Sequence, residues 1–364
     1  MSFDYTNLLS SQSSTLNPTK LKEKVQLSAI ISTRNRAKQL ANLFQCLGLQ
    51  KDIENLNFEI VIVDNNSSDN TKEVAYAFCE GSNLKVNYLF EEKTGLSNAR
   101  NAGILASKGS YLIFIDDDVL LPKDFFSRVL FGLEEYPEFH IFGYKVLPDW
   151  QEARSPFWLS FKRPFNLSQS FLPIHDLGGE PLSYPNRKSR NPLGACFLAK
   201  KEVFEKLGPF RDDLGAGTQS GLHEDSEFFW RSMANGFKLL YWPYAFVYHP
   251  VDPKRLSVSY LHKWYFNSGK SLYLIKNTGG VKREIRELEN WRIGNENKEL
   301  KKLFQALSTR KNIPVFLFFK LFLLILLLPA SLFLLLIKRP FYFSTLLLRN
   351  IGEISQVLKV NKQG

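Results

Sequence analysis

The sequence predicts an α/β protein built on a largely parallel central sheet. Short apolar segments alternate with stretches whose apolar residues recur at helical spacing, and this alternation is typical of βαβ units. Of the 364 residues, 44% are hydrophobic and 23% are charged, so the chain is globular and can form a large core. Polar residues directly follow several apolar segments, at the place where strands of an open α/β sheet reach the edge that binds ligands.

The first half of the chain carries the regular part of this pattern. After a polar lead-in of residues 1–25, strands are expected at residues 27–31 and 58–63 and in the segments KVNYLFEE and GSYLIFIDDD. Helical stretches are expected between them, up to about Gln50, through Cys79 and across SNARNAGILASKG. Asp64 and a run of three aspartates then follow the second and fourth strands directly.

The second half is less regular. Residues 150–191 are rich in proline, aromatic and basic residues, which is typical of a lid, a binding loop or a disordered segment. A strand and a helix that stops at Gly208 and Pro209 are expected in GACFLAKKEVFEKLGPF. A further helix is expected in HEDSEFFWRSMANGF, two short strands in KLLYWPYAFVYHP, and basic aromatic helices from about Leu256 to Arg310.

The three aspartates, Asp116, Asp117 and Asp118, need an explanation. Adjacent carboxylates repel one another and cannot be buried without compensation. A divalent cation would compensate them, because hard cations prefer oxygen ligands, whereas an acidic turn or a helix N-cap is the alternative. Their position after an apolar strand favours the cation site.

The charges are unevenly distributed along the chain. Residues 1–150 hold 15 lysines and arginines against 19 aspartates and glutamates, a net of −4, whereas residues 151–364 hold 32 against 17, a net of +15. A basic half favours an anionic membrane surface or an anionic ligand; no nucleic-acid motif is present, so no nucleic-acid partner is expected. The three cysteines are far apart, which argues for a reducing compartment.

A long apolar run predicts membrane association. Residues 313–337 are 25 residues with one charge, Lys320, and this length can cross a bilayer. Basic residues flank both ends and Pro329 divides the run, so a single span, a kinked hairpin and an in-plane anchor all stay open. We therefore expect residues 313–348 to be membrane-associated and residues 349–364 to form a tail.

Five segments, in this order along the chain, carry a resemblance to a known family: AIISTRNRAKQL, EIVIVDNNSSDNT, GLSNARNAGILASKGSYLIFIDDDV, GACFLAKKEVFEKLGPF and HEDSEFFWR. Together they resemble the family 2 glycosyltransferases, over residues 27–249. The resemblance implies a GT-A fold at residues 26–250, a nucleotide-diphosphate sugar of the UDP or GDP type as donor, and a Mn or Mg ion as cofactor. Its details are similar to bacterial enzymes that build surface or extracellular polysaccharide.

The resemblance also implies roles for the residues that follow the strands. Asp118 would coordinate the metal, and Asp116 would contact the ribose or help to hold the ion. His249 resembles a histidine that some relatives place near the metal, although a lone histidine is more often structural. The residues expected to contact the nucleotide are Thr33, Arg34, Asp64, Arg100 and Asp116. A plain turn at Asp64 and a surface position for Arg100 are the alternatives.

Inverting transfer needs a base, and a carboxylate opposite the leaving group can act as one. The HED segment matches the family's acidic motif, with Asp225 expected as the base and Glu224 beside it as the other candidate. The alternative is that both residues only complement the positive end of a helix.

The resemblance, taken together with the apolar run, implies an inverting hexosyltransferase at the cytoplasmic face of a membrane, acting on a glycan or lipid-linked acceptor. Residues 251–312 would form a basic helical acceptor or linker region between the catalytic domain and the membrane segment. One rival is a nucleotidyltransferase on a similar sheet, although STRNRAK lacks the glycines of a triphosphate loop. The other is a membrane or nucleic-acid binder without enzymatic activity.

Overall fold

The computed structural model describes residues 26–51, 53, 56–150, 153–154, 171–186, 188–189, 191–218, 221–278, 348 and 351. The predicted lead-in of residues 1–25 and the apolar run of residues 313–337 lie outside these residues, and so do residues 279–312 of the predicted basic helical region. What the sequence predicts for those segments stays a prediction.

A mixed sheet of eight strands forms the centre of the described chain, in the order β3-β2-β1-β4-β7-β5-β8-β6. The strands are β1 (Gln26–Thr33), β2 (Asn57–Asp64), β3 (Lys85–Phe90), β4 (Tyr111–Asp116), β5 (Ile141–Asp149), β6 (Leu182–Tyr184), β7 (Cys196–Lys200) and β8 (Leu239–Pro250). β6 and β7 run antiparallel to their neighbours, and the other pairs are parallel. The predicted α/β class with a mostly parallel sheet is confirmed.

Helices cover both faces of this sheet. They are α3 (Ala37–Gly48), α4 (Thr71–Gly81), α5 (Leu96–Ala106), α6 (Phe125–Glu135), α8 (Lys201–Leu207), α9 (Glu224–Ala234) and α10 (Val258–Thr278), with a 3-10 turn η1 (Pro253–Leu256). Because side chains alternate along a strand, Ala29 and Ile31 of β1 join a core with α3 and α6, whereas Ile30 joins a core with α5, α8 and α9. Burial on both faces explains why the parallel strands are nearly continuous apolar runs.

A glycine sets the position of α5 against the sheet. A Cβ atom added at Gly103 would lie 2.4 Å from Cγ2 of Ile30, so α5 approaches β1 more closely than any residue with a side chain would allow. Arg100, one turn earlier in the same helix, is thereby held close to the ends of β1 and β4.

β8 differs from the sequence prediction, which expected two short strands there. It is a single strand with a bulge: Tyr144 of β5 pairs with Trp242, but the next residue, Lys145, pairs with Phe246. Pro243 lies in the bulge, where its missing N–H does not break the ladder. The interruption at Pro243 is therefore a bulge within one strand and not a break between two strands.

The end of β8 reaches the residues that follow β4. Leu120 and Tyr248 exchange backbone hydrogen bonds, with Leu120 N 2.8 Å from Tyr248 O and Tyr248 N 3.0 Å from Leu120 O. His249 is the next residue of β8, so this bridge carries it to the aspartate run.

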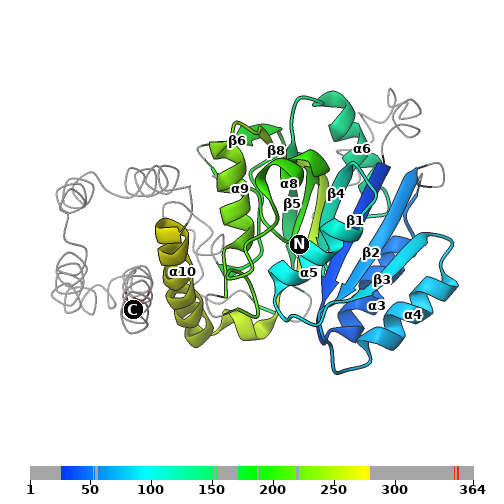
Figure 1. Cartoon of the computed structure of the whole chain (residues 1–364), viewed down its shortest axis with the longest axis horizontal. Coiled ribbons are helices and arrows are strands. Elements are labelled where there is room, and N and C mark those ends of the chain that lie inside the picture. The colour runs from blue at the N-terminus through cyan, green and yellow to red at the C-terminus, as the bar shows by residue number, and fades with distance from the viewer. Residues whose placement is uncertain are drawn as a thin grey trace.

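α10 lies beside α9, at the opposite end of the described molecule from β3 and α4 (Figure 1). Leu272 and Ile275 of α10 pack with Leu214 and with Trp230 of α9. Among the described helices, none combines the length and the apolar character needed to cross a membrane.

Candidate active site

A cavity of about 410 Å³ opens at the carboxyl ends of β1 and β4. The predicted site residues that line it are Thr33, Arg34, Arg100, Asp116, Asp118, Glu224, Asp225 and His249. They meet there because β1, β4 and β8 all direct their carboxyl ends to the same edge of the sheet. The fold thus brings together side chains that are far apart in the sequence.

The second and third aspartates share a cationic partner. Asp116 is the last residue of β4, and Asp117 and Asp118 form the turn that follows it. Arg36 Nη1 lies 3.2 Å from Asp117 Oδ1 and also contacts Asp118 Oδ2. The other oxygen of Asp118, Oδ1, lies 3.2 Å from Nε2 of His249.

The first aspartate pairs with a buried arginine. Arg100, whose side chain is 3% exposed, places Nη2 3.2 Å from Asp116 Oδ1 and Nη1 3.0 Å from Glu224 Oε1. It also donates from Nη2 to the carbonyl of Gly194 at 2.9 Å. Arg100 therefore joins the aspartate run of β4 to the start of α9, and the surface alternative for this residue is wrong.

These contacts and the low exposure shift the acid–base properties of the cluster. Burial raises the pKa of Asp117 to about 7, and burial also raises the pKa of Asp116. Burial acts in the same direction on Asp118, but the hydrogen bond and charge of His249, together with Arg36, outweigh it and hold the pKa of Asp118 below its usual range. The same contact raises the pKa of His249, although burial alone would lower it.

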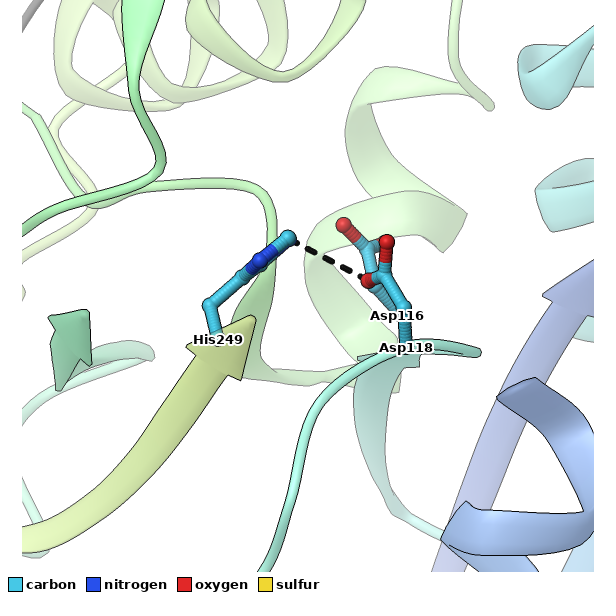
Figure 2. A group of neighbouring side chains, drawn as sticks. All are labelled: Asp116, Asp118 and His249. Atoms are coloured by element: carbon cyan, nitrogen blue, oxygen red, sulfur yellow. Dashed lines mark ion pairs between the residues drawn. The ribbon is translucent and has the colours of Figure 1, made fainter. Parts of the chain in front are cut away.

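Asp116, Asp118 and His249 form a group that fits a divalent cation. One ligand atom from each residue lies within 4.8 Å of the others, and Figure 2 shows the imidazole at the end of β8 facing the two carboxylates. The Nδ1–H of His249 donates to the carbonyl of Pro250 at 2.9 Å, so Nε2 is the nitrogen that faces the aspartates. Metal-binding histidines commonly use their second nitrogen in this way, and carboxylate oxygens suit Mg and Mn.

The two carboxylates at the start of α9 have different surroundings. Glu224 is 7% exposed, and burial, followed by repulsion from Asp225, raises its pKa to about 7. Asp225 is half-buried; its Oδ2 accepts from the backbone N–H of Gly194 at 2.9 Å, and its Oδ1 accepts from Ser226 N at 2.6 Å. A Cβ atom at Gly194 would lie 2.4 Å from Asp225 Oδ2, so the glycine makes room for this carboxylate.

The residues expected to contact the nucleotide are less uniform. Thr33 is buried at the end of β1 and Arg34 is exposed, and both line the cavity. Asp64 is 1% exposed and is absent from the cavity lining, whereas Asn65 lines it. Asp64 accepts hydrogen bonds from the hydroxyl of Tyr88 and the backbone N–H of Ser67, each at 3.0 Å. The turn that was the alternative for Asp64 is therefore present, and its contact with a nucleotide stays a prediction.

Sequence reasoning missed two contributors to the site. Arg36 follows Asn35, whose φ of +52° turns the chain; the only sequence signal is an asparagine, which tolerates this conformation, before a second arginine. His223 has a φ of +70° immediately before α9, and its Nε2 lies 2.8 Å from Ser268 Oγ of α10. No local pattern predicts that α10 supports the start of α9.

The fold and the cavity define an α/β protein with a candidate cation site at the carboxyl edge of its sheet. Residues 28–208 match the model of Glycosyl transferase family 2, and the chain belongs to this family of glycosyltransferases. The family predicted from the five ordered motifs is confirmed.

Three similar proteins illustrate the range of the match. Poly(ribitol-phosphate) beta-N-acetylglucosaminyltransferase TarS of Staphylococcus aureus is 28% identical over 112 residues, which are 31% of this chain and 19% of TarS. Succinoglycan biosynthesis protein ExoM of Rhizobium meliloti is 23% identical over 236 residues, which are 65% of this chain and 71% of ExoM. The chain thus matches about a fifth of the length of TarS.

The third is a solved structure of the mannosyltransferase PcManGT from Pyrobaculum calidifontis, in complex with GDP-Man and Mn2+. It superposes with a TM-score of 0.54 over 92% of this chain and 88% of PcManGT, at 16% sequence identity. At this identity the likeness concerns the fold, and it agrees with the fold class predicted from the sequence.

Proposed function

We propose that this chain is an inverting glycosyltransferase that moves a hexose from a UDP- or GDP-linked sugar to a hydroxyl of a glycan or lipid-linked acceptor. The observation that carries the proposal is a single cavity lined both by the Asp116, Asp118 and His249 group and by Asp225. Such a cavity holds a place for the diphosphate beside a carboxylate that can take a proton. TarS is named as a GlcNAc transferase and PcManGT as a mannosyltransferase, and both names support a sugar donor of this kind.

Asp225 is the proposed base. It accepts the proton of the acceptor hydroxyl while the hydroxyl oxygen forms a bond to the anomeric carbon; the bond from that carbon to the diphosphate oxygen breaks, and its electron pair leaves with the nucleoside diphosphate. Attack on the face opposite the leaving group inverts the configuration. The Gly194 amide, 2.9 Å from Asp225 Oδ2, holds the carboxylate in a fixed orientation during the transfer.

Asp116, Asp118 and His249 are proposed to hold the metal, and Mn suits a set that includes an imidazole better than the harder Mg. A divalent cation there supplies positive charge that stabilises the departing diphosphate. Thr33, Arg34 and Asp64 are proposed on the base and ribose side, and Arg100 holds Asp116 in place toward the nucleotide. The complex of PcManGT with GDP-Man and Mn2+ supports this assignment.

We place the reaction at the cytoplasmic face of a membrane, in the synthesis of surface or extracellular polysaccharide. The basic second half of the chain, with a net charge of +15, and the apolar run of residues 313–337 support this location. The name of ExoM, a succinoglycan biosynthesis protein, supports the polysaccharide role.

A panel of UDP- and GDP-sugars, each tested with Mn²⁺, Mg²⁺ or EDTA, tests the activity. We expect release of the nucleoside diphosphate with one group of donors and only with a divalent metal, and NMR of the product should show an inverted anomeric configuration. Asp124→Asn, at an exposed aspartate outside the cavity, is the matched control for Asp225→Asn and should retain full activity. Release of pyrophosphate from a nucleoside triphosphate would instead identify a nucleotidyltransferase, and no turnover of any donor would leave a binding protein.

The location is tested separately with the full chain. The wild-type protein should sediment with membranes and resist extraction by carbonate. Leu324→Lys with Leu327→Lys should weaken this association, because each charge in the apolar run costs about 2.5–3.5 kcal/mol of insertion free energy. Protease access to the catalytic domain only from the outer face would contradict the proposed side.

A further inference from the structure

We propose that Arg36 is a built-in counter-cation that competes with the divalent metal for Asp118, and so sets the metal affinity of the donor-free protein. The proposal rests on the metal group of the proposed function. It concerns the state that precedes donor binding, in which three aspartates must be compensated without a diphosphate nearby.

The backbone around Arg36 is fixed, while its side chain is not enclosed. Asn35 N donates to Ser67 Oγ at 2.9 Å, and Asn35 Oδ1 accepts from Ser68 N at 2.7 Å. Arg36 N donates to Thr71 Oγ1 at 3.3 Å. The guanidinium group, by contrast, belongs to a side chain that is 38% exposed. A change of side-chain rotamer can therefore move the charge without any movement of the loop.

The two oxygens of Asp118 face different partners. Oδ1 lies 3.2 Å from Nε2 of His249, which is the side where a cation shared with His249 would bind, and Oδ2 contacts Nη1 of Arg36. A doubly charged ion at Oδ1 and a guanidinium at Oδ2 would repel each other and would neutralise the same carboxylate. Each therefore lowers the free energy gained by binding the other.

Asp117 gives the displaced arginine a second partner. Its carboxylate is 3.2 Å from Nη1 of Arg36 and is not part of the cation group. When a metal binds Asp118, Arg36 can release Oδ2 and stay paired with Asp117. This explains why the run has three aspartates where the cation group uses only the first and third.

Titration of the metal-stripped full-length protein with Mn²⁺ alone, followed by calorimetry or by EPR of the free ion, tests the competition. We expect Arg36→Met to lower the Kd for Mn²⁺ about tenfold, because the competing charge is gone. Arg34→Met removes the same charge from an exposed side chain that lines the same cavity, so it measures the general effect of charge, which should be less than about threefold. Arg36→Lys keeps the charge but not the planar guanidinium. Its Kd for Mn²⁺ should lie between the values of Arg36→Met and Arg34→Met.

Thermal unfolding adds a readout that does not depend on activity. Without metal, Arg36→Met should unfold at a lower temperature than Arg34→Met, and saturating Mn²⁺ should raise its midpoint by more than it raises that of the wild type. In a double-mutant cycle, Asp117→Asn should weaken Mn²⁺ binding in the wild type more than in the Arg36→Met background.

An Arg36→Met protein that binds Mn²⁺ no more tightly than the wild type would overturn the proposal and leave the proposed function intact. Equal tightening in Arg34→Met would overturn it as well, since the effect would then be general. If neither the wild type nor any variant binds Mn²⁺, the metal part of the proposed function fails, and this proposal fails with it.

Discussion

The two halves of the sheet reach the cavity by different routes. In the first half, β3, β2, β1 and β4 are all parallel, and simple βαβ units deliver their carboxyl ends to one edge. In the second half, β7 enters between β4 and β5 in the opposite direction, and β8 carries a bulge before it reaches that edge. The first half supplies the aspartate run together with Arg36 and Arg100, which pair with it. The second half supplies His249, Glu224 and Asp225.

The two halves of the sheet supply different groups to the proposed site. The groups proposed for the nucleotide and most of the metal ligands come from regular strand ends, where position is fixed by the sheet register. The proposed base and the third metal ligand, Asp225 and His249, come from the start of α9 and the end of the bulged β8. Arg100 is the residue that contacts carboxylates of both halves. The halves can therefore be separated experimentally by which step each substitution affects.

The largest effect is expected in the first half. Asp118→Ala removes an oxygen ligand from the cation group and the partner of His249, so transfer should fall by about 10⁴-fold, in line with the several kcal/mol that a catalytic metal supplies. Mn²⁺ binding, measured by calorimetry, should be lost while the circular dichroism spectrum stays that of the wild type. Near-normal turnover by this variant would show that the aspartate run is only a turn.

A large but different effect is expected in the second half. Asp225→Asn keeps an oxygen that can accept from Gly194 N but cannot take a proton, so kcat should fall about 10²–10⁴-fold. The Kd for Mn²⁺ and for the nucleoside diphosphate should change little, and this is what separates the two halves. An active Asp225→Asn protein beside an inactive Glu224→Gln protein would show that the base is Glu224 and not Asp225.

Arg100, which contacts carboxylates of both halves, is expected to contribute to the stability of the fold. Arg100→Met leaves the buried Glu224 and the half-buried Asp116 without their common partner, so the free energy of unfolding should fall by about 3–5 kcal/mol in urea denaturation. Lys206→Met breaks an exposed helical pair with Glu202 and should cost less than about 1 kcal/mol. Similar losses in the two variants would mean that Arg100 does not couple the halves.

The sequence predicted the first half better than the second, for a physical reason. Parallel strands buried on both faces are continuous apolar runs, and the polar residue that follows each run marks the ligand edge, so Asp64 and Asp116 could be placed at strand ends in advance. The bulge at Pro243 depends on pairing with β5, which no local pattern reveals.

The candidate site was likewise predicted only in part from the sequence. The family resemblance, carried by residues after the strands and in the SNARN and HED segments, named eight of the residues that line the cavity. Contacts between distant elements were not predictable: Tyr88 on the neighbouring strand engages Asp64, and Arg36 reaches the aspartates across the loop after β1. These contacts depend on side-chain orientation in the folded chain, which sequence spacing does not encode.

The smallest effect is a change in the pH dependence of stability, and it arises where the halves meet. Glu224 faces Arg100, Asp225 and Asp116, and burial raises its pKa from the ordinary 4.5 to about 7. Between these two values the folded protein binds more protons at this site than the unfolded chain does, so the contribution of Glu224 to stability is complete below about pH 4.5 and is lost as the pH rises through 7.

Glu224→Gln, which stays neutral, removes this dependence. In EDTA, the unfolding free energy of the wild type relative to Glu224→Gln should therefore fall by about 1–3 kcal/mol between pH 4.5 and pH 8. Urea denaturation of both proteins across this range measures the difference, and a constant difference would show that Glu224 is already ionised at low pH beside Arg100.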